Sequence, residues 1–343
     1  MKLSKRNLVL LLIGAPLVIL WILSQLGTGL GTSQLPPPEF VFYTKQPKPA
    51  IAGSIPPRNW NAPAAVAAIH DRLFVLDTGN DRILELNDTG EVTAVLCETG
   101  DCQFLLRGAQ ALTVHNQELY VANTGAGQVV VLSPSGSVLD TLNIQVPGSP
   151  ESEKFSPSGV AVSQKGDIYV ADTKRSLVLR LTRDNRVPSV ILDGRAQEEK
   201  YRANAPMGLA IDAQDSLYVA NSGNGLIRMY SPEGRHLQEF AMRSNPAFFS
   251  PAYLAIDISG NVYFTDNRSS MIFVYDPAGN LVGTVGLLDA RRIDSPGVLR
   301  DPQGICWEGS TLYVADRTAG LFGFEIDPGY WRTRPPSQSW LHP

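Results

Sequence analysis

The sequence contains few of the residues from which most enzyme and nucleic-acid sites are built. Its 343 residues include only four histidines and three cysteines, and Lys plus Arg (29) fall short of Asp plus Glu (33), for a net charge of −4. Nucleic-acid-binding proteins usually show a basic excess or stripe, so we predict no nucleic-acid partner. The chain also lacks a Gly-x-Ser-x-Gly elbow, a Walker loop and a Gly-x-Gly-x-x-Gly motif. We therefore assign no catalytic residue, no cofactor and no metal ligand.

What the chain does contain is apolar surface and turn residues. Hydrophobic residues make up 43% and charged residues 18%, together with 30 glycines and 25 prolines. This composition excludes overall disorder, which requires low hydrophobicity with high net charge. It predicts a compact domain with many turns.

The first 26 residues predict a membrane helix. Lys2, Lys5 and Arg6 precede an apolar run, Leu8–Leu26, which as a helix would span about 28 Å, close to the roughly 30 Å of a hydrocarbon core. We interpret it as a single-pass signal anchor with a cytoplasmic N-terminus and the rest of the chain on the periplasmic or extracellular side. The alternative is a cleaved signal peptide, with residues 27–29 as the small-residue site, which would leave a secreted protein.

Residues 27–62 form a linker rich in proline and glycine, which predicts a semi-extended stalk. Glu39–Tyr43 and Ala50–Ile55 are its candidate strands. Residues 328–343 form a proline-rich tail with no strand pattern. The folded domain is therefore expected over residues 63–327.

Between these boundaries the chain repeats itself, with an apolar segment that ends in Asp or Asn every 45–50 residues. The six copies are Leu73–Asp77, Leu119–Asn123, Ile168–Asp172, Leu217–Asn221, Val262–Asp266 and Leu312–Asp316.

Each repeat predicts four short strands. Before each copy lies another apolar stretch, such as Gly208–Ile211, and after it come an alternating segment, such as Leu226–Tyr230, a Pro/Gly turn and a weaker strand, such as Leu281–Val285. The β-branched and aromatic residues favour strands. One four-stranded sheet cannot bury both of its faces, whereas six packed radially can, which is the architecture of a β-propeller.

The repeat resembles a known family. Pro206–Asn224, with Pro-x-Gly-Leu-Ala-Ile-Asp followed by Leu-Tyr-Val-Ala-Asn-Ser-Gly-Asn, looks like the NHL repeat, and Pro157–Asp172 and Pro302–Asp316 are similar. The resemblance covers residues 63–327 and implies an all-β, six-bladed NHL-type propeller with four-stranded blades. The first two copies depart from it, with Ala64-Ala65-Val66 where glycine is usual and no proline before Ala109–Leu112.

The last repeat ends after its third strand, at Leu321–Ile326. Closing the ring then requires a strand from the N-terminal side, and we expect part of residues 39–55 to supply the outer strand of the final blade. Such closure would remove free sheet edges.

The Asp or Asn that ends each repeated strand has two interpretations. A ring of these side chains could bind a metal, as in the propeller lactonases that this fold resembles. We favour turn capping, because a residue that recurs in every blade is explained by turn geometry and not by a single site. Only His70 and His115 occupy equivalent turns, and two histidines are too few for the catalytic zinc set that the resemblance to amidating lyases would imply.

Cys97 and Cys102 flank a short turn, and in an exported domain we predict a disulfide between them. Cys306, beside Trp307 in an apolar strand, is expected to be a buried free thiol.

The remaining candidate is a surface. In a propeller, the loops before the first strand and after the second strand of each blade share one face, and here these loops concentrate arginine and aromatic residues, which are enriched in interface cores. The residues that we assign to this face are Arg58, Trp60, Arg82, Arg107, Lys174, Arg175, Phe248, Phe249, Tyr253, Arg268, Arg300 and Arg317.

These observations favour a membrane-anchored binding or scaffold module for a protein, peptide or glycan partner. One alternative is a metal-dependent hydrolase or lyase of gluconolactonase or amidating-lyase type. A second is an accessory subunit of a membrane complex that packs through the Leu8–Leu26 helix.

Overall fold

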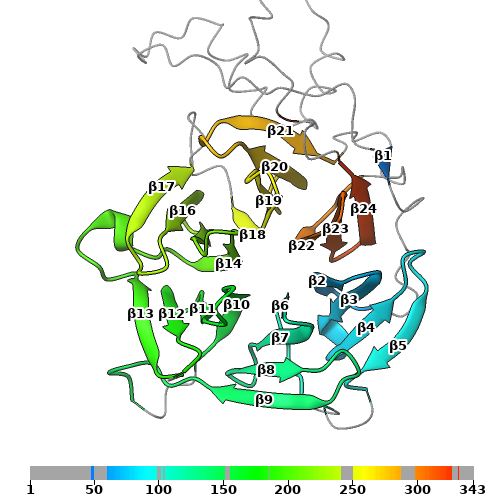
Figure 1. Cartoon of the computed structure of the whole chain (residues 1–343), viewed down its shortest axis with the longest axis horizontal. Helices are drawn as coiled ribbons and strands as arrows, with labels where there is room; N and C mark the ends of the chain where they lie inside the picture. The colour runs from blue at the N-terminus through cyan, green and yellow to red at the C-terminus, as the bar shows by residue number, and fades with distance from the viewer. Residues whose placement is uncertain are drawn as a thin grey trace, which may run out of the picture.

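The structure is a computed structural model that describes residues 48–49, 60–98, 102, 105–150, 155–184, 186–240, 250–286, 298–326 and 331. Within these residues the strands form six four-stranded antiparallel sheets, which are arranged as blades around a central axis (Figure 1). This confirms the six-bladed propeller. Among the described residues no helix has the length and apolar character needed to cross a membrane, and the predicted Leu8–Leu26 helix lies outside them.

Each blade begins at the centre of the ring and proceeds outward. Blade 1 contains β2 (Pro63–Ile69), β3 (Arg72–Asp77), β4 (Arg82–Leu86) and β5 (Val92–Leu96), with the short 3₁₀ helix η1 (Thr78–Asn80) between β3 and β4. Blade 2 contains β6 (Ala111–His115), β7 (Glu118–Asn123), β8 (Gln128–Leu132) and β9 (Val138–Asn143). Blade 3 contains β10 (Pro157–Val162), β11 (Ile168–Asp172), β12 (Leu177–Leu181) and β13 (Pro188–Asp193), followed by η2 (Glu199–Tyr201).

The second half of the ring repeats this order. Blade 4 contains β14 (Pro206–Ile211), β15 (Leu217–Asn221), β16 (Leu226–Tyr230) and β17 (His236–Phe240). Blade 5 contains β18 (Pro251–Ile256), β19 (Val262–Asp266), β20 (Met271–Tyr275) and β21 (Leu281–Val285). Blade 6 contains β22 (Pro302–Glu308), β23 (Thr311–Asp316) and β24 (Gly320–Glu325), with β1 (Lys48–Pro49) as its outer strand.

The ring is closed by pairing of the two ends of the described chain. β1 pairs antiparallel with β24, with Lys48 opposite Glu325 and Pro49 opposite Phe324. This strand lies inside the window 39–55 in which we expected the closing strand, but between the two candidate segments, Glu39–Tyr43 and Ala50–Ile55. Most of the predicted linker and of the tail 328–343 lies outside the described residues.

The hydrophobic core lies between the blades. Six clusters of buried side chains each join neighbouring sheets: one packs Phe74 and Leu76 of blade 1 against Val121 and Val130 of blade 2, and another packs Val66 of blade 1 against Leu321 of blade 6. Because the second strand of each blade is covered on both faces, it is mostly apolar up to its final Asp or Asn, whereas outer strands such as β13 are half exposed.

Close packing near the axis explains the glycines of the first strands. A Cβ on Gly159, Gly208 or Gly304 would collide with main-chain atoms of the next blade, at Met207, Ala252 and Ala65 respectively. Glycine at these positions therefore lets adjacent inner strands approach each other.

Candidate functional site

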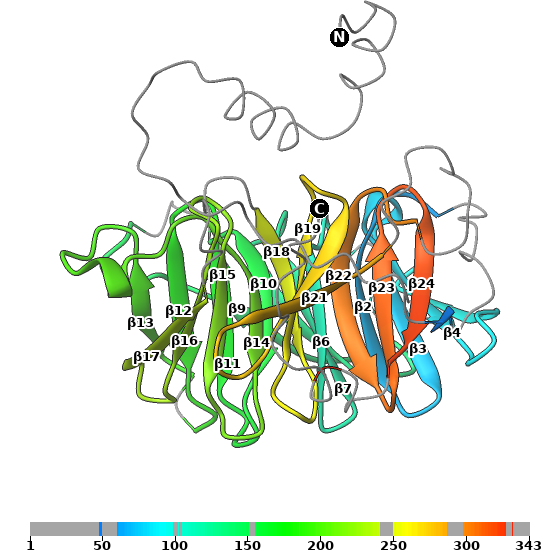
Figure 2. The same cartoon turned by 90° about the horizontal axis from the view of Figure 1, so that it is seen from above.

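The strands run between two faces of the ring (Figure 2). In the described blades the start of the first strand pairs with the end of the second, as Pro157 with Asp172 and Pro302 with Asp316. The loops before each first strand and after each second strand therefore share one face, as the sequence predicted. We call this the loop face and the other the hairpin face.

The six strand-end Asp and Asn residues lie just beneath the loop face, and all are fully buried. Each uses a side-chain oxygen to accept a main-chain N–H from the loop 16 or 17 residues earlier. The six pairs are Asn61 to Asp77 (2.6 Å), Arg107 to Asn123 (2.7 Å), Ser156 to Asp172 (3.1 Å), Asn204 to Asn221 (2.9 Å), Ser250 to Asp266 (3.1 Å) and Arg300 to Asp316 (2.7 Å). The same hydrogen bond thus recurs in all six blades and fixes the loop that leads into the first strand of each blade.

Several of these side chains also cap the turn that follows them. Asp316 accepts N–H groups from Asp301, Thr318 and Ala319 in addition to Arg300. The side-chain oxygens of these residues thus accept hydrogen bonds from the main chain and hold the loops in place. This is the turn capping that we favoured over a ring of metal ligands.

The described residues also contain no group of three or more His, Cys, Asp or Glu side chains that could hold a metal ion. His115 and His236 are instead partly buried in the blades, where desolvation lowers the pKa of each imidazole.

Five of the predicted cationic residues are exposed on the loop face. They are Arg107, Lys174, Arg268, Arg300 and Arg317. The main chain beneath them is held firmly: Ser270 donates from its hydroxyl to the oxygen of Arg300 (2.6 Å), and the N–H of Arg317 donates to the oxygen of Asp301 (2.9 Å). The described part of the loop face therefore presents exposed cations, and at Arg300 and Arg317 the main chain that carries them is hydrogen-bonded.

Arg82 and Arg175, which we also assigned to this face, each pair with a strand-end carboxylate. Their guanidinium groups lie 2.8 Å from the buried carboxylates of Asp77 and Asp172, and both side chains are largely covered. A buried carboxylate requires such a partner. These two arginines therefore stabilise their own blades, and only part of each is available to a ligand.

One aromatic assignment needs correction. Tyr253 does not lie on the loop face, because it is buried within the ring and points into the central channel. Trp60 is half-buried and packs against the cluster that joins blades 1 and 6. Arg58, Phe248 and Phe249 lie outside the described residues.

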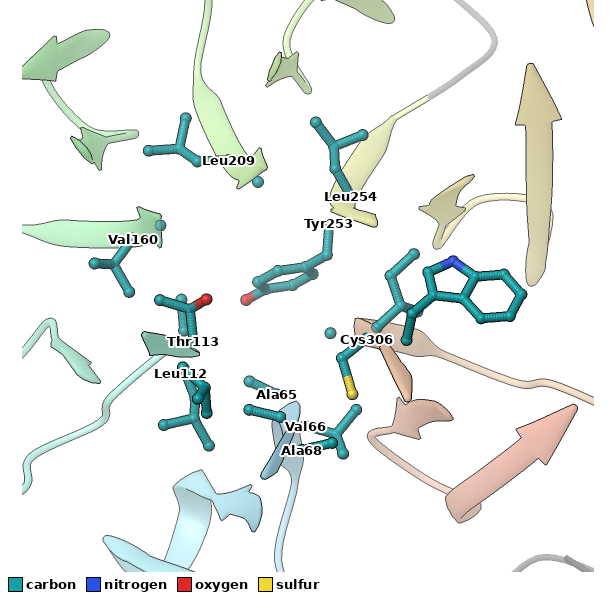
Figure 3. Close-up of a pocket in the computed structure, with 18 residues that line it drawn as sticks. Ala65, Val66, Ala68, Leu112, Thr113, Val160, Leu209, Tyr253, Leu254 and Cys306 are labelled. Carbon is teal, nitrogen blue, oxygen red and sulfur yellow. The ribbon is translucent and has the colours of Figure 1, made fainter. Parts of the chain in front are cut away.

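The central channel contains a cavity of about 260 Å³. Its walls come from the first strands of all six blades, and Figure 3 shows Val66, Leu112, Val160, Leu209, Leu254 and Tyr253 around it. Cys306 also lines it as a free thiol, half-buried rather than fully buried, and desolvation raises its pKa.

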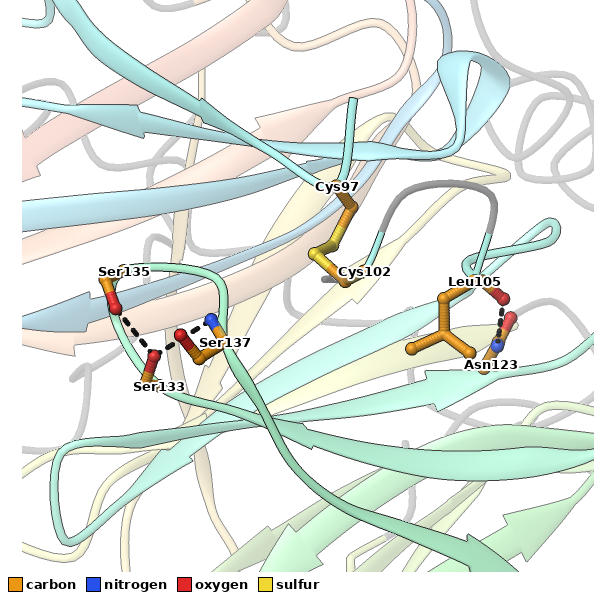
Figure 4. Close-up of a disulfide and its surroundings, with 7 residues drawn as sticks. All are labelled: Cys97, Cys102, Leu105, Asn123, Ser133, Ser135 and Ser137. Atoms are coloured by element: carbon orange, nitrogen blue, oxygen red, sulfur yellow. Dashed lines mark hydrogen bonds between the residues drawn. A yellow bond between two sulfur atoms is a disulfide. The ribbon is translucent and has the colours of Figure 1, made fainter. Parts of the chain in front are cut away.

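Cys97 and Cys102 form a disulfide at the edge of blade 1 (Figure 4). Both residues are buried in the cluster that joins blades 1 and 2, which also contains Leu106 and Leu132. The bond fixes the end of β5 to the segment that leads toward β6, so its place in the fold is structural.

Comparison with known protein families identifies one of the repeats that form the blades. The sequence model of the NHL repeat matches residues 156–181, which include β10, β11 and β12. Residues 156–181 are an NHL repeat. In this NHL repeat Asp172 is the strand-end residue, and Ser156, which donates to it, is the first residue of the match. No curated protein matches the chain in sequence.

Solved propellers share the fold at low identity. A gluconolactonase from Xanthomonas campestris is 16% identical with a TM-score of 0.58, covering 82% of this chain and 95% of that one. A virginiamycin B lyase from Staphylococcus aureus is 15% identical with a TM-score of 0.55, covering 79% and 97%. A propeller in a nidogen/laminin complex is 16% identical with a TM-score of 0.55, covering 72% and 86%. At these identities the likeness concerns the fold alone.

Sequence reasoning did not anticipate the role of Tyr253. A signal was present, because Pro251-Ala252-Tyr253 has tyrosine where Pro-x-Gly is found in the repeats of blades 3, 4 and 6. Its partner Thr265, whose hydroxyl accepts the Tyr253 N–H at 3.1 Å, likewise replaces the alanine of four other blades. The two departures occur together in blade 5.

Proposed function

We propose that this propeller is an extracytoplasmic binding module, anchored to a membrane by its N-terminal segment, that recognises a protein or peptide through the loop face. The observation behind the proposal is the set of six buried Asp and Asn side chains that fix the incoming loops. Rigid loops lose little conformational entropy when a partner binds, which favours affinity.

Charge on the loop face supports a partner with acidic groups. Arg107, Lys174 and Arg317 are exposed there, while the carboxylates of Asp77, Asp172 and Asp316 lie buried beneath the surface. Arginine is also a frequent hot-spot residue in protein interfaces. One structural neighbour is part of a nidogen/laminin complex, so this fold is used in at least one protein assembly.

The alternative of a metal-dependent hydrolase or lyase has less support. Its relatives in fold include a gluconolactonase and a virginiamycin B lyase, but the described part of the chain does not bring together three His, Cys, Asp or Glu side chains that could hold a metal ion. The option of an accessory membrane subunit depends on the Leu8–Leu26 helix and is one form of the same binding role.

The test is a cross-linking capture of the tagged full-length protein from its own membranes, with Arg107→Glu plus Lys174→Glu as the loop-face variant. Arg183→Glu plus Arg235→Glu, two exposed arginines in turns of the hairpin face, provides a charge-matched control. We expect a stoichiometric partner that is lost with the loop-face variant and retained with the control, at unchanged melting temperatures.

A partner that both variants retain would remove the loop face from the proposal. A lone monomer that captures no protein would contradict the binding role itself. In that case metal analysis and a lactone and ester hydrolysis screen would follow.

A further inference from the structure

Tyr253 closes the central channel near the loop face. It follows the first proline of β18 by two residues, the place that Gly159, Gly208 and Gly304 hold in β10, β14 and β22. Its ring projects across the axis (Figure 3), and its hydroxyl donates to the main-chain oxygen of Gln110 at 2.8 Å. Because blades 5 and 2 lie on opposite sides of the ring (Figure 1), the Tyr253 side chain and its hydrogen bond span the full width of the channel.

Beyond Tyr253 the channel remains open as the 260 Å³ cavity, whose walls combine small residues with larger aliphatic ones. Ala65, Ala68 and Ala111 line it together with the three glycines, and none of the eighteen lining residues carries a charge. Thr113, Cys306, Trp307 and Tyr253 contribute the polar side-chain atoms. The first strand is also the inner edge of each of the six sheets. The main-chain N–H and C=O groups on that edge have no partner strand, so they face the axis and can form hydrogen bonds with a ligand.

We propose that this cavity is a binding site for a small uncharged aromatic molecule about the size of indole. An engineered apolar cavity of about 150 Å³ holds benzene, so a cavity of about 260 Å³ accommodates a bicyclic ring. An ionic ligand would be desolvated without a counter-charge, which is costly. The phenol of Tyr253 is already engaged with Gln110, so the main-chain edges and Thr113 supply the polar contacts.

The register of the strands places the entrance at the hairpin face. Ala68 pairs with Leu73 and Trp307 with Leu312, close to the turns that join the first and second strands. Val114 lies at the same level in blade 2, opposite Leu119. These residues surround the end of the cavity opposite Tyr253, so a ligand enters between them.

The experiment titrates the folded full-length protein with fluoroindole and follows the probe by fluorine NMR. We expect saturable line broadening with a Kd on the order of 0.1–1 mM, typical of a ligand with so few atoms. Ala68→Leu adds bulk to the cavity wall, and Thr113→Ile adds a carbon atom and removes the hydroxyl that we assign to the ligand, so each should weaken binding at least about tenfold. Ala213→Leu, an exposed residue in a turn of the hairpin face, is the matched control and should bind like wild type.

Two further readouts make the result decisive. A carboxylated fluoroindole should bind at least about tenfold more weakly than the neutral probe, and equal binding would overturn the uncharged class. Melting temperatures establish that the variants fold, and if Ala68→Leu does not, Thr113→Ile provides the same comparison. Absence of saturable binding to the wild-type protein, or equal affinity in these two variants, would overturn the site and leave a channel that holds water only.

Discussion

The hydroxyl of Tyr253 donates a hydrogen bond of 2.8 Å to the main-chain oxygen of Gln110, a residue 143 positions earlier in the sequence. The contact joins blade 5 to blade 2 across the axis of the ring, whereas the hydrophobic clusters mainly join adjacent blades. It both braces the ring and closes one end of the channel. The pKa of the Tyr253 phenol is raised by desolvation, so the group remains a proton donor over the whole physiological range.

Tyr253→Phe should lower the free energy of unfolding by about 1–2 kcal/mol, because the oxygen of Gln110 loses its donor inside the ring while the packing of the aromatic ring is kept. Urea unfolding followed by circular dichroism measures the change. Tyr201→Phe, in the 3₁₀ helix η2 at the edge of the ring, is the control and should change stability by less than about 0.5 kcal/mol. Equal stability of the two variants would show that the bond across the axis contributes nothing.

Asp316→Ala should destabilise the fold by about 3 kcal/mol or more, since four main-chain N–H groups, those of Arg300, Asp301, Thr318 and Ala319, lose their acceptor. Asp88→Ala, in an exposed turn, should cost less than about 0.5 kcal/mol. Thermal melts of both variants test this. A loss at Asp316 no larger than that at Asp88 would contradict the role of the strand-end residues in fixing the loops.

The cysteines should differ in their response to alkylation. Cys97 and Cys102 are bonded and buried, so in exported protein they should react only after reduction and unfolding. Cys306 should react slowly at pH 8, because desolvation raises the pKa of its thiol and little thiolate is present. Mass spectrometry of alkylated peptides reports each site. Rapid labelling of Cys97 in the native, unreduced protein would refute the disulfide.

The fold should lose stability at alkaline pH. Burial raises the pKa of Tyr230 and of Tyr120 from 10.0 to about 12, and the hydroxyl of Tyr230 also donates to the oxygen of Lys200 at 2.6 Å. The folded state therefore favours the neutral phenol. The resulting contribution of these tyrosines to the free energy of unfolding is fully present below about pH 10, the pKa of tyrosine in the unfolded chain. It is lost as the pH rises from about 10 through 12.

Parallel titrations of tyrosinate absorbance and circular dichroism test the alkaline transition. We expect much of the absorbance change to coincide with unfolding, and Tyr230→Phe to shift the unfolding midpoint in pH. Ionisation of all eleven tyrosines near pH 10 in a fully folded protein would contradict the burial of these phenols.

Local pattern was sufficient for most strands. Leu226–Tyr230 and Leu281–Val285 were expected from the sequence with the bounds that the structure has. The reason is that alternating apolar residues between Pro/Gly turns specify a short strand without long-range information. The closing strand was harder to place, because the two residues Lys48–Pro49 have no periodicity of their own and are defined only by pairing with β24.

The surface chemistry was less predictable. Position in a loop was enough to assign Arg107 and Lys174 to the exposed loop face, but not to distinguish them from Arg82 and Arg175, whose charges are paired with buried carboxylates. That distinction depends on where a strand-end carboxylate lies relative to the guanidinium in three dimensions.

The number of blades, their strand order and the place of the strand-end Asp or Asn in each could be read from the sequence, because all of these follow from a local pattern repeated six times. The direction of the Tyr253 side chain, and hence the closure of the channel, depends instead on packing between distant parts of the chain. The Tyr253 side chain could point to either side of its short strand. Its direction depends on Thr265 in its own blade and on Gln110 on the opposite side of the ring, which both form hydrogen bonds with Tyr253.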